Sequence, residues 1–178
     1  VMNISLAYIG KDFHVGAAAL GATASAFFLG YTLMQIPGGY LTDKFGSKLM
    51  VIISLFAWSL MTMVTGWAWS LAALIAIRFL FGIAEGPYPA AALKRISENY
   101  DKSEKSQATS ALISSNYAGA AVAPLIIVPI IASNGWRNAF VWLGVGGFII
   151  LLAYYLVERP INSSQENGQA RPKIEWKK

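Results

Sequence analysis

Two ionisable residues, Arg78 and Glu85, interrupt a long apolar stretch of the sequence, RFLFGIAEGPYPAA at residues 78–91. Seven residues turn a helix through about 700°, so both side chains project from one face, about 10.5 Å apart along the axis. That separation is too long for the direct pairing that adjacent turns allow. An arginine offers a planar fork for a carboxylate, and a carboxyl group in apolar surroundings retains its proton more readily. The pair therefore predicts an anion site beside a proton site, with a structural polar network between helices as the alternative.

The elements that carry this pair are long apolar segments. The chain has 178 residues, of which 56% are hydrophobic and 13% charged, whereas soluble domains carry about 25% charged residues. A helix needs about 20 apolar residues to cross the hydrocarbon core of a bilayer. We therefore expect an all-α integral membrane protein with a partial first helix and five full spans, at about residues 1–9, 17–40, 48–66, 71–93, 106–132 and 137–157. Because the chain opens in mid-pattern, the start of the first helix is expected to precede Val1.

The residue types disfavour several kinds of chemistry. The chain has no Cys, which removes disulfides, thiolate metal sites and thiol nucleophiles. The predicted spans contain no Ser/His dyad, no paired aspartates and no His/Cys cluster. We therefore expect neither an enzyme nor a metal or cofactor site.

Basic residues indicate the orientation of the predicted spans. The connections 41–48 and 93–105 and the tail 158–178 hold most of them, whereas the alternate connections hold only Lys11 and Arg137. Short loops rich in Lys and Arg remain on the cytoplasmic side, which predicts a multi-pass protein of the cell membrane with these three segments in the cytoplasm. Tryptophans, which settle at membrane interfaces, mark the opposite edge: Trp67, Trp69 and Trp136.

The formal net charge of +5 follows from this basic cytoplasmic edge. Its expected partner is the anionic surface of the lipid bilayer, and no nucleic acid is needed to explain it. The polar tail from residue 158 onward is predicted to begin a solvated cytoplasmic linker, because its composition is too polar to form a core.

The connection between the first two complete spans reads GYLTDKFGSK at residues 39–48. Gly39 and Gly46 permit the tight backbone geometry of a helical hairpin. Asp43 is placed to cap the following helix or to face its positive N-terminal end. Lys44 and Lys48 keep the connection at the cytoplasmic surface. A well-formed turn accounts for all five residues without any further role.

The same ten residues have the spacing G-x-x-x-D-K-x-G-x-K, which resembles the signature loop of the major facilitator superfamily, apart from Ser47, where a basic residue is common. Three segments resemble its anion:cation symporter branch, which includes sugar-acid permeases. They are RFLFGIAEGPYPAA, IPGGYLTDKFGSK and NGWRNAFVWLG. The resemblance implies the N-terminal six-helix half of a twelve-helix transporter, with the C-terminal half as its missing partner. It also implies that the loop is a conformational-gate motif made of Gly39, Asp43, Lys44, Gly46 and Lys48. Within it, Asp43 and Lys44 would help to hold one conformation of the transporter against helices of the other half.

Further roles follow from the same resemblance. Arg78 would bind the anionic group of a substrate, and Glu85 would carry the coupled proton. Tyr31 and Asn116 match positions that line the substrate cavity, although a hydrogen bond between helices explains each of them equally well. The expected function is proton-coupled symport of a small organic anion by alternating access, with a sugar acid such as a hexuronate, galactonate or glucarate favoured.

Other functions stay open at this point. Sodium is an alternative coupling ion. A sugar porter or a drug/proton antiporter would use the same scaffold, and a six-helix scaffold or channel subunit would also fit the apolar pattern.

Small residues and prolines predict how the segment around Glu85 packs. Gly82 and Gly86 have the small-xxx-small spacing that lets two membrane helices approach closely. Pro87 and Pro89 follow directly, and we expect them to kink the helix just beyond Glu85.

Overall fold

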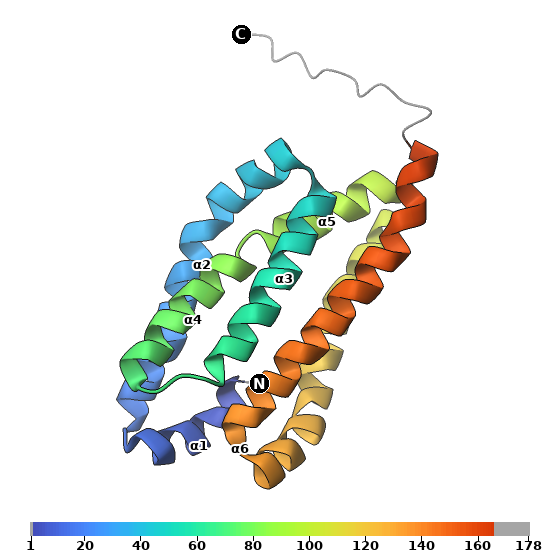
Figure 1. Cartoon of the computed structure of the whole chain (residues 1–178). Helices are drawn as coiled ribbons and strands as arrows, with labels where there is room; N and C mark the ends of the chain where they lie inside the picture. Colours follow the sequence, from blue (N-terminus) through green and yellow to red (C-terminus); the bar gives the residue numbers. More distant parts are fainter. Residues whose placement is uncertain (1, 166–178) are drawn as a thin grey trace.

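The computed structural model describes residues 2–165, with the side chains of Asn3 and residues 159–165 outside that description. Over this range the chain is all-helical, as predicted (Figure 1). The helices are α1 (Met2–Phe13), α2 (Ala17–Phe45), α3 (Ser47–Thr65), α4 (Leu71–Glu85), α5 (Tyr88–Asn99) and α6 (Lys105–Gln165).

Four stretches of the described chain are long and apolar enough to cross a membrane: Ala17–Phe45, Ser47–Thr65, Leu71–Asn99 and Lys105–Glu158. Large apolar side chains also cover the outside of these helices, and Ile36 on α2 is 85% exposed. A soluble protein rarely leaves extended apolar surface in water, so this surface agrees with a lipid environment.

Helix α6 contains a reversal at Gly135, whose φ of 76° and ψ of 162° lie outside helical values. Glycine adopts such a positive φ without the steric cost that a side chain would bring. The element therefore consists of two arms, 105–134 and 136–165, which run in opposite directions in Figure 1. These arms correspond to the predicted spans 106–132 and 137–157. The second arm remains helical to Gln165, beyond the predicted end at 157, and the rest of the predicted tail lies outside the described residues.

The predicted connection 41–48 is almost absent from the structure, because α2 continues to Phe45 and α3 begins at Ser47. Gly46 alone reverses the chain, with a φ of 91°. Gly39, Asp43 and Lys44 therefore lie on the last turns of α2 and not in a loop, and Lys48 lies in the first turn of α3. The predicted connection 93–105 is shortened in the same way, because α5 extends to Asn99.

The predicted kink after Glu85 is present. Helix α4 ends at Glu85 and α5 begins at Tyr88, with Gly86 and Pro87 between them in helical torsion angles. Gly86 still donates its N–H to the carbonyl of Gly82 at 2.9 Å. Pro87 and Pro89 have no N–H to continue the ladder, so the chain bends there without unwinding.

Helices α2 and α4 approach each other at glycines on both sides. A Cβ atom at Gly82 of α4 would collide with the carbonyl oxygen of Phe27, and one at Gly30 of α2 would collide with that of Phe79. A Cβ at Gly38 would lie 2.7 Å from the Cα of Pro87. The small-residue spacing thus permits the close contact expected from the sequence.

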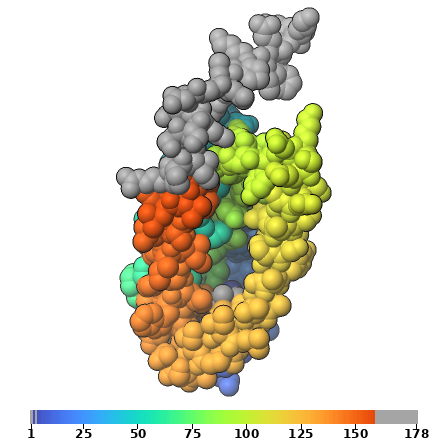
Figure 2. Space-filling view, turned by 90° about the vertical axis from the view of Figure 1, so that its right-hand side faces the viewer, coloured from blue at the N-terminus to red at the C-terminus, as the bar shows by residue number. Residues whose placement is uncertain are grey.

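The connections alternate between two ends of the bundle (Figure 1). The α2–α3 turn, the α5–α6 connection and the far end of α6 lie at one end, which we call the basic end. The α1–α2 and α3–α4 connections and the reversal at Gly135 lie at the other, which we call the Gly135 end. In Figure 2 the first arm of α6 stands apart from the second arm, with a hollow between them.

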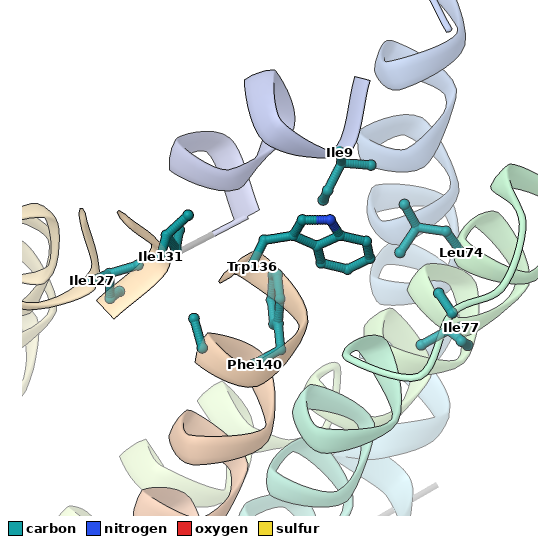
Figure 3. Packing of buried hydrophobic residues seen from close by; sticks show 9 residues of the cluster. Ile9, Leu74, Ile77, Ile127, Ile131, Trp136 and Phe140 are labelled. Atoms are coloured by element: carbon teal, nitrogen blue, oxygen red, sulfur yellow. The ribbon is translucent and has the colours of Figure 1, made fainter. Parts of the chain in front are cut away.

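An apolar core fills the Gly135 end (Figure 3), where α1, α4 and α6 meet. Trp136 belongs to this core and is only 5% exposed, so its ring is surrounded by protein. Its ring packs edge-on against Phe13 and Phe140, which hold it among the helices. Trp67 and Trp69, in contrast, are exposed at this end.

The α2–α4 contact yields a stability prediction. In Gly82→Ala the new methyl group collides with the backbone of α2, at a cost of about 1–3 kcal/mol that outweighs the gain in helix propensity of about 1 kcal/mol. Gly119→Ala, on the first arm of α6 where no atom lies near the glycine, gains that propensity alone. Denaturant unfolding in detergent should therefore show Gly82→Ala destabilised and Gly119→Ala slightly stabilised. Equal stabilities for the two variants would contradict the close contact.

Candidate functional site

Arg78 lies on the buried face of α4. The helix begins after Ser70, whose side chain accepts a hydrogen bond from the N–H of Ala73 at 3.1 Å and so caps it. Arg78 is only 6% exposed, and its Nε has no hydrogen-bond partner. Among the described residues, no carboxylate forms an ion pair with it. A buried charge normally has such a partner, so an unpaired guanidinium marks this place as a candidate anion site.

Aromatic rings, in place of carboxylates, contact this guanidinium. Its carbon atom Cζ lies 5.2 Å from the ring centroid of Phe81 and 5.7 Å from that of Phe140. Both distances are within the range of a cation–π attraction. Phe81 belongs to α4, and Phe140 to the second arm of α6.

Glu85 is the last residue of α4 and is partly buried. In the described part of the chain its carboxylate makes neither a hydrogen bond nor an ion pair. Arg78 and Glu85 therefore stay apart along the helix, and each keeps its hydrogen-bonding capacity. Across residues 2–165, no three His, Cys, Asp or Glu side chains converge as metal ligands would.

Tyr31 reaches the same region through aromatic contacts. Its ring stacks on Phe27 of α2, with centroids 5.9 Å apart and planes 22° from parallel. Phe27 in turn contacts Phe81 with a centroid distance of 5.8 Å. The close approach of α2 and α4 therefore connects Tyr31 to Arg78 through contacts with the rings of Phe27 and Phe81.

Asn116 is a predicted site residue that the structure does not bring close to Arg78 and Tyr31. It lies on the first arm of α6 and is exposed. Among the described residues it has no hydrogen bond to Arg78, Glu85 or Tyr31. The arm that carries it stands apart from the second arm of α6 over most of its length (Figure 2).

The predicted gate motif takes part in polar contacts at the basic end. Asp43 accepts from the ammonium group of Lys94 on α5 at 2.5 Å, so its predicted role as a cap of α3 is wrong. The reason is its position inside α2, three residues before Gly46, while the N-terminus of α3 has no side-chain cap. Lys44 lies over the ring of Phe45 at 5.3 Å, and Gly39 has open space around its Cα.

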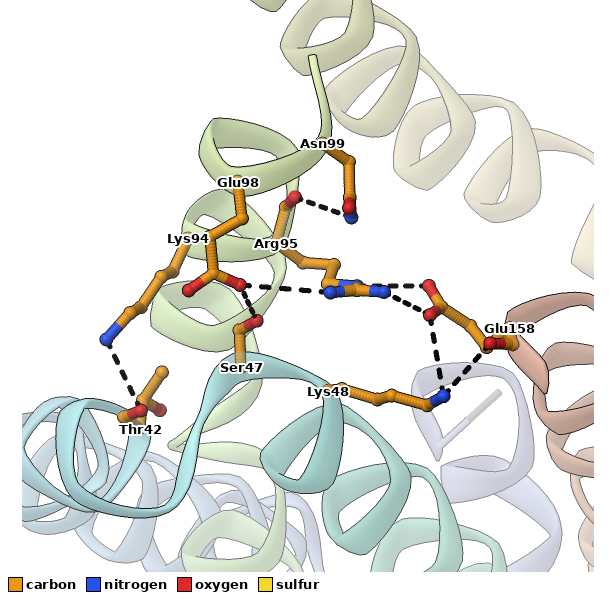
Figure 4. Close-up of polar contacts among 8 residues, drawn as sticks. All are labelled: Thr42, Ser47, Lys48, Lys94, Arg95, Glu98, Asn99 and Glu158. Carbon is orange, nitrogen blue, oxygen red and sulfur yellow. Dashed lines mark hydrogen bonds and ion pairs between the residues drawn. The ribbon is translucent and has the colours of Figure 1, made fainter. Parts of the chain in front are cut away.

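A larger polar network connects α3, α5 and α6 at this end (Figure 4). Arg95 donates through two nitrogens to the carboxylate of Glu158, with Nε 3.1 Å from Oε1. Lys48 donates to the backbone carbonyl of Glu158 at 3.0 Å, and Ser47 donates to Glu98. Such two-pronged arginine–carboxylate pairs are among the stronger polar contacts in proteins. Glu158 is only 6% exposed, so this pair is largely shielded from solvent.

Sequence reasoning missed this network. It took the basic residues of 93–105 only as a sign of orientation, although Glu98 and Glu158 lie near the same predicted cytoplasmic edge. Those two acids were the available sign that some of the cations are paired.

A second ionic contact lies at the Gly135 end. Asp12 accepts from Arg137 and, at 3.3 Å, from Nε1 of Trp136, and Arg137 also donates to the carbonyl of Ala68 at 3.2 Å. The hydrogen bond from Arg137 is the main cause that lowers the pKa of the Asp12 carboxyl below its usual value. Asp12, Trp136 and Arg137 border an open pocket of about 590 Å³ that is also lined by His14.

Comparison with known proteins places these features in a family. The sequence profile described as "Major Facilitator Superfamily" matches residues 1–178. The chain is 32% identical over 180 residues to a probable sulfoacetate transporter of Cupriavidus necator, covering 99% of this chain and 42% of that protein.

Two proteins of Escherichia coli K12 are also similar. A probable galactarate/D-glucarate transporter is 32% identical, with 94% of this chain and 39% of that protein covered. A probable L-galactonate transporter is 27% identical, with 89% and 35% covered. The chain thus spans about two-fifths of the length of these relatives. With a family match over its whole length and apolar helices on both sides of the Arg78 site, the chain belongs to the Major Facilitator Superfamily of multi-pass membrane transporters.

Proposed function

We propose that the chain is the N-terminal six-helix half of a twelve-helix transporter that carries a sugar acid, or a similar small organic anion, together with protons. Two observations support six crossings. The apolar part of α6, Lys105–Glu158, would extend about 80 Å as one straight helix, more than twice the thickness of a bilayer core. Its reversal at Gly135 instead gives two crossings, and α1 supplies part of another.

The basic end is proposed to face the cytoplasm. The described cations Lys44, Lys48, Lys94 and Arg95 gather there on α2, α3 and α5, and cytoplasmic loops of membrane proteins carry such an excess. The Gly135 end would then face outward, and the site around Arg78 would be approached from either side in turn.

The observation that carries the proposal is the unpaired, buried guanidinium of Arg78. A charge in the middle of a membrane costs about 2.5–3.5 kcal/mol on insertion scales, so such a residue persists where it serves a function. The relatives named above are probable transporters of sulfoacetate, galactarate, D-glucarate and L-galactonate, all organic anions. A guanidinium fork matches the carboxylate group of such substrates.

Glu85 is proposed as the proton-carrying group. It lies on the same helix as Arg78 with no described partner, so it can gain or lose a proton without first breaking an ion pair. Tyr31, two aromatic rings away, is proposed to donate a hydrogen bond to substrate hydroxyl groups. Asn116 would join them only after the first arm of α6 closes against the rest of the cavity.

Substitutions of Arg78 test substrate binding in the complete transporter. The assay measures uptake of labelled sulfoacetate, D-glucarate, D-galactonate and a hexuronate into proteoliposomes. Arg78→Gln removes a charged hydrogen bond worth about 1.5–3 kcal/mol, so KM for the best substrate should rise about 10- to 100-fold. Arg78→Lys keeps the charge but loses the fork, and an intermediate KM is expected. Lys102→Gln, an equal loss of charge at an exposed site, is the control.

An unchanged KM in Arg78→Gln would refute the proposed anion site. Preference for neutral sugars or for cationic drugs in the same assay would favour a sugar porter or an antiporter. Uptake that does not saturate would favour a channel.

Glu85→Gln tests the coupling. The amide mimics the protonated carboxyl but cannot release a proton, so accumulation driven by a pH gradient should be lost while exchange of labelled for unlabelled substrate persists. Glu104→Gln, an exposed acid near the start of α6, should accumulate substrate normally. Gradient-driven accumulation that survives in Glu85→Gln would rule out this role, and a sodium gradient tested separately would reveal sodium coupling.

The gate motif is proposed to stabilise one conformation through Asp43 and Lys94. The carboxylate of Asp43 is 76% exposed, and exposed pairs contribute at most about 1 kcal/mol to stability. Asp43→Asn should therefore change the free energy of unfolding by less than about 1 kcal/mol. It should still slow transport, because the substitution weakens a contact proposed to stabilise one conformation. Glu158→Gln breaks a buried pair and should cost about 3 kcal/mol or more. A transport rate of Asp43→Asn equal to that of the wild type would contradict the gate role.

A further inference from the structure

The guanidinium of Arg78 lies close to two aromatic rings from different helices. Phe81 is less than one turn further along α4, and Phe140 comes from the second arm of α6, with centroids 5.2 and 5.7 Å from Cζ. No acidic side chain takes this position among the described residues. Among the described residues, the two rings are thus the groups found in direct contact with the charge.

Aromatic rings hold a cation in a different way from a carboxylate. The π face attracts positive charge through its quadrupole, but it neither accepts two parallel N–H bonds nor cancels the charge. A carboxylate at the same place would do both, and it would compete with the carboxylate of a substrate. The unpartnered Nε of Arg78 fits this description, because it is buried and still without an acceptor.

Both rings are themselves fixed by their neighbours. Phe140 is 2% exposed and packs edge-on against Trp136 at a centroid distance of 6.1 Å, as Figure 3 shows. Trp136 donates to Asp12 at 3.3 Å, so the position of Phe140 is tied to the polar contacts of the Gly135 end. Phe81 is held on its side by Phe27 at 5.8 Å.

We propose that Phe140, together with Phe81, positions the guanidinium of Arg78 for the anionic group of the substrate. Phe140 acts through Arg78 and does not itself contact the substrate, so it is a positioning residue. The side chain of Arg78 has many rotamers in solution, and holding it in place before binding lowers the entropy lost when the anion arrives. This inference rests on the proposed role of Arg78.

Fluorinated phenylalanines at position 140 test the proposal in the complete transporter. Successive fluorine atoms weaken the π face for a cation while the ring keeps nearly the same volume. KM for the best substrate of the panel above should rise stepwise, by about 2- to 10-fold for the trifluorinated ring, while kcat stays within about twofold. A KM that stays constant along the series would overturn the proposal.

Phe148 provides the matched control on the same arm of α6. Its ring meets Phe56 at a centroid distance of 5.5 Å, and no cation–π contact is found for it among the described residues. The same fluorinated series at Phe148 should leave KM unchanged. An equal rise at both positions would show that fluorination acts through general packing and would also overturn the proposal.

Arg78→Gln separates a failure of this inference from a failure of the proposed function. If this substitution leaves KM unchanged, the anion site itself is wrong. If it raises KM while the fluorinated series at position 140 does not, only the positioning role is wrong. Phe140→Tyr, which retains the ring, should keep KM near the wild-type value, whereas Phe140→Leu should raise it at an unchanged kcat, with melting temperatures measured for both variants.

Discussion

The contact between the backbones of α2 and α4 determines the arrangement of the candidate site. Gly30 and Gly82 leave no room for a Cβ between these helices, so the carbonyl groups of one helix lie directly against the other. In a membrane, where apolar side chains gain little by leaving lipid, such close packing is a main source of helix association. It also brings Phe27 against Phe81. Tyr31 and Arg78, on separate helices, thereby become parts of one group.

Polar contacts at the two ends of the bundle differ in strength and in what they connect. At the basic end, the buried pair of Arg95 and Glu158 fixes α5 to α6, whereas Asp43 and Lys94 meet near the surface. At the Gly135 end, Asp12 connects α1 to Arg137 and Trp136 on α6. Loss of the exposed pair at the basic end should therefore loosen the helices much less than loss of the buried pair.

Much of the fold follows from simple patterns in the sequence, whereas the pairing of helices does not. Apolar segment length predicted the helices, and Pro87 and Pro89 predicted the kink, whereas the reversal at Gly135 came only from the structure. The ends of α2 and α5 were missed because polar residues such as Asp43 and Glu98 look like loop residues until their partners are known. Those partners, Lys94 and Ser47, lie 51 residues away in each case. The periodicity of one helix contains no information about which face of another helix it meets. Arg78 was singled out by its rarity in an apolar helix, but its ring contacts depend on the fold.

The unpaired guanidinium of Arg78 also affects how the protein and its substrate depend on each other. A buried charge without a counter-ion lowers the stability of the empty protein. Under the proposed function, a bound anion removes that deficit and adds stability in proportion to the logarithm of its concentration above Kd. The substrate would then act as a folding ligand as well as a cargo. Cells that take up such an anion would retain more of the folded transporter while the anion is plentiful, with no change in its synthesis.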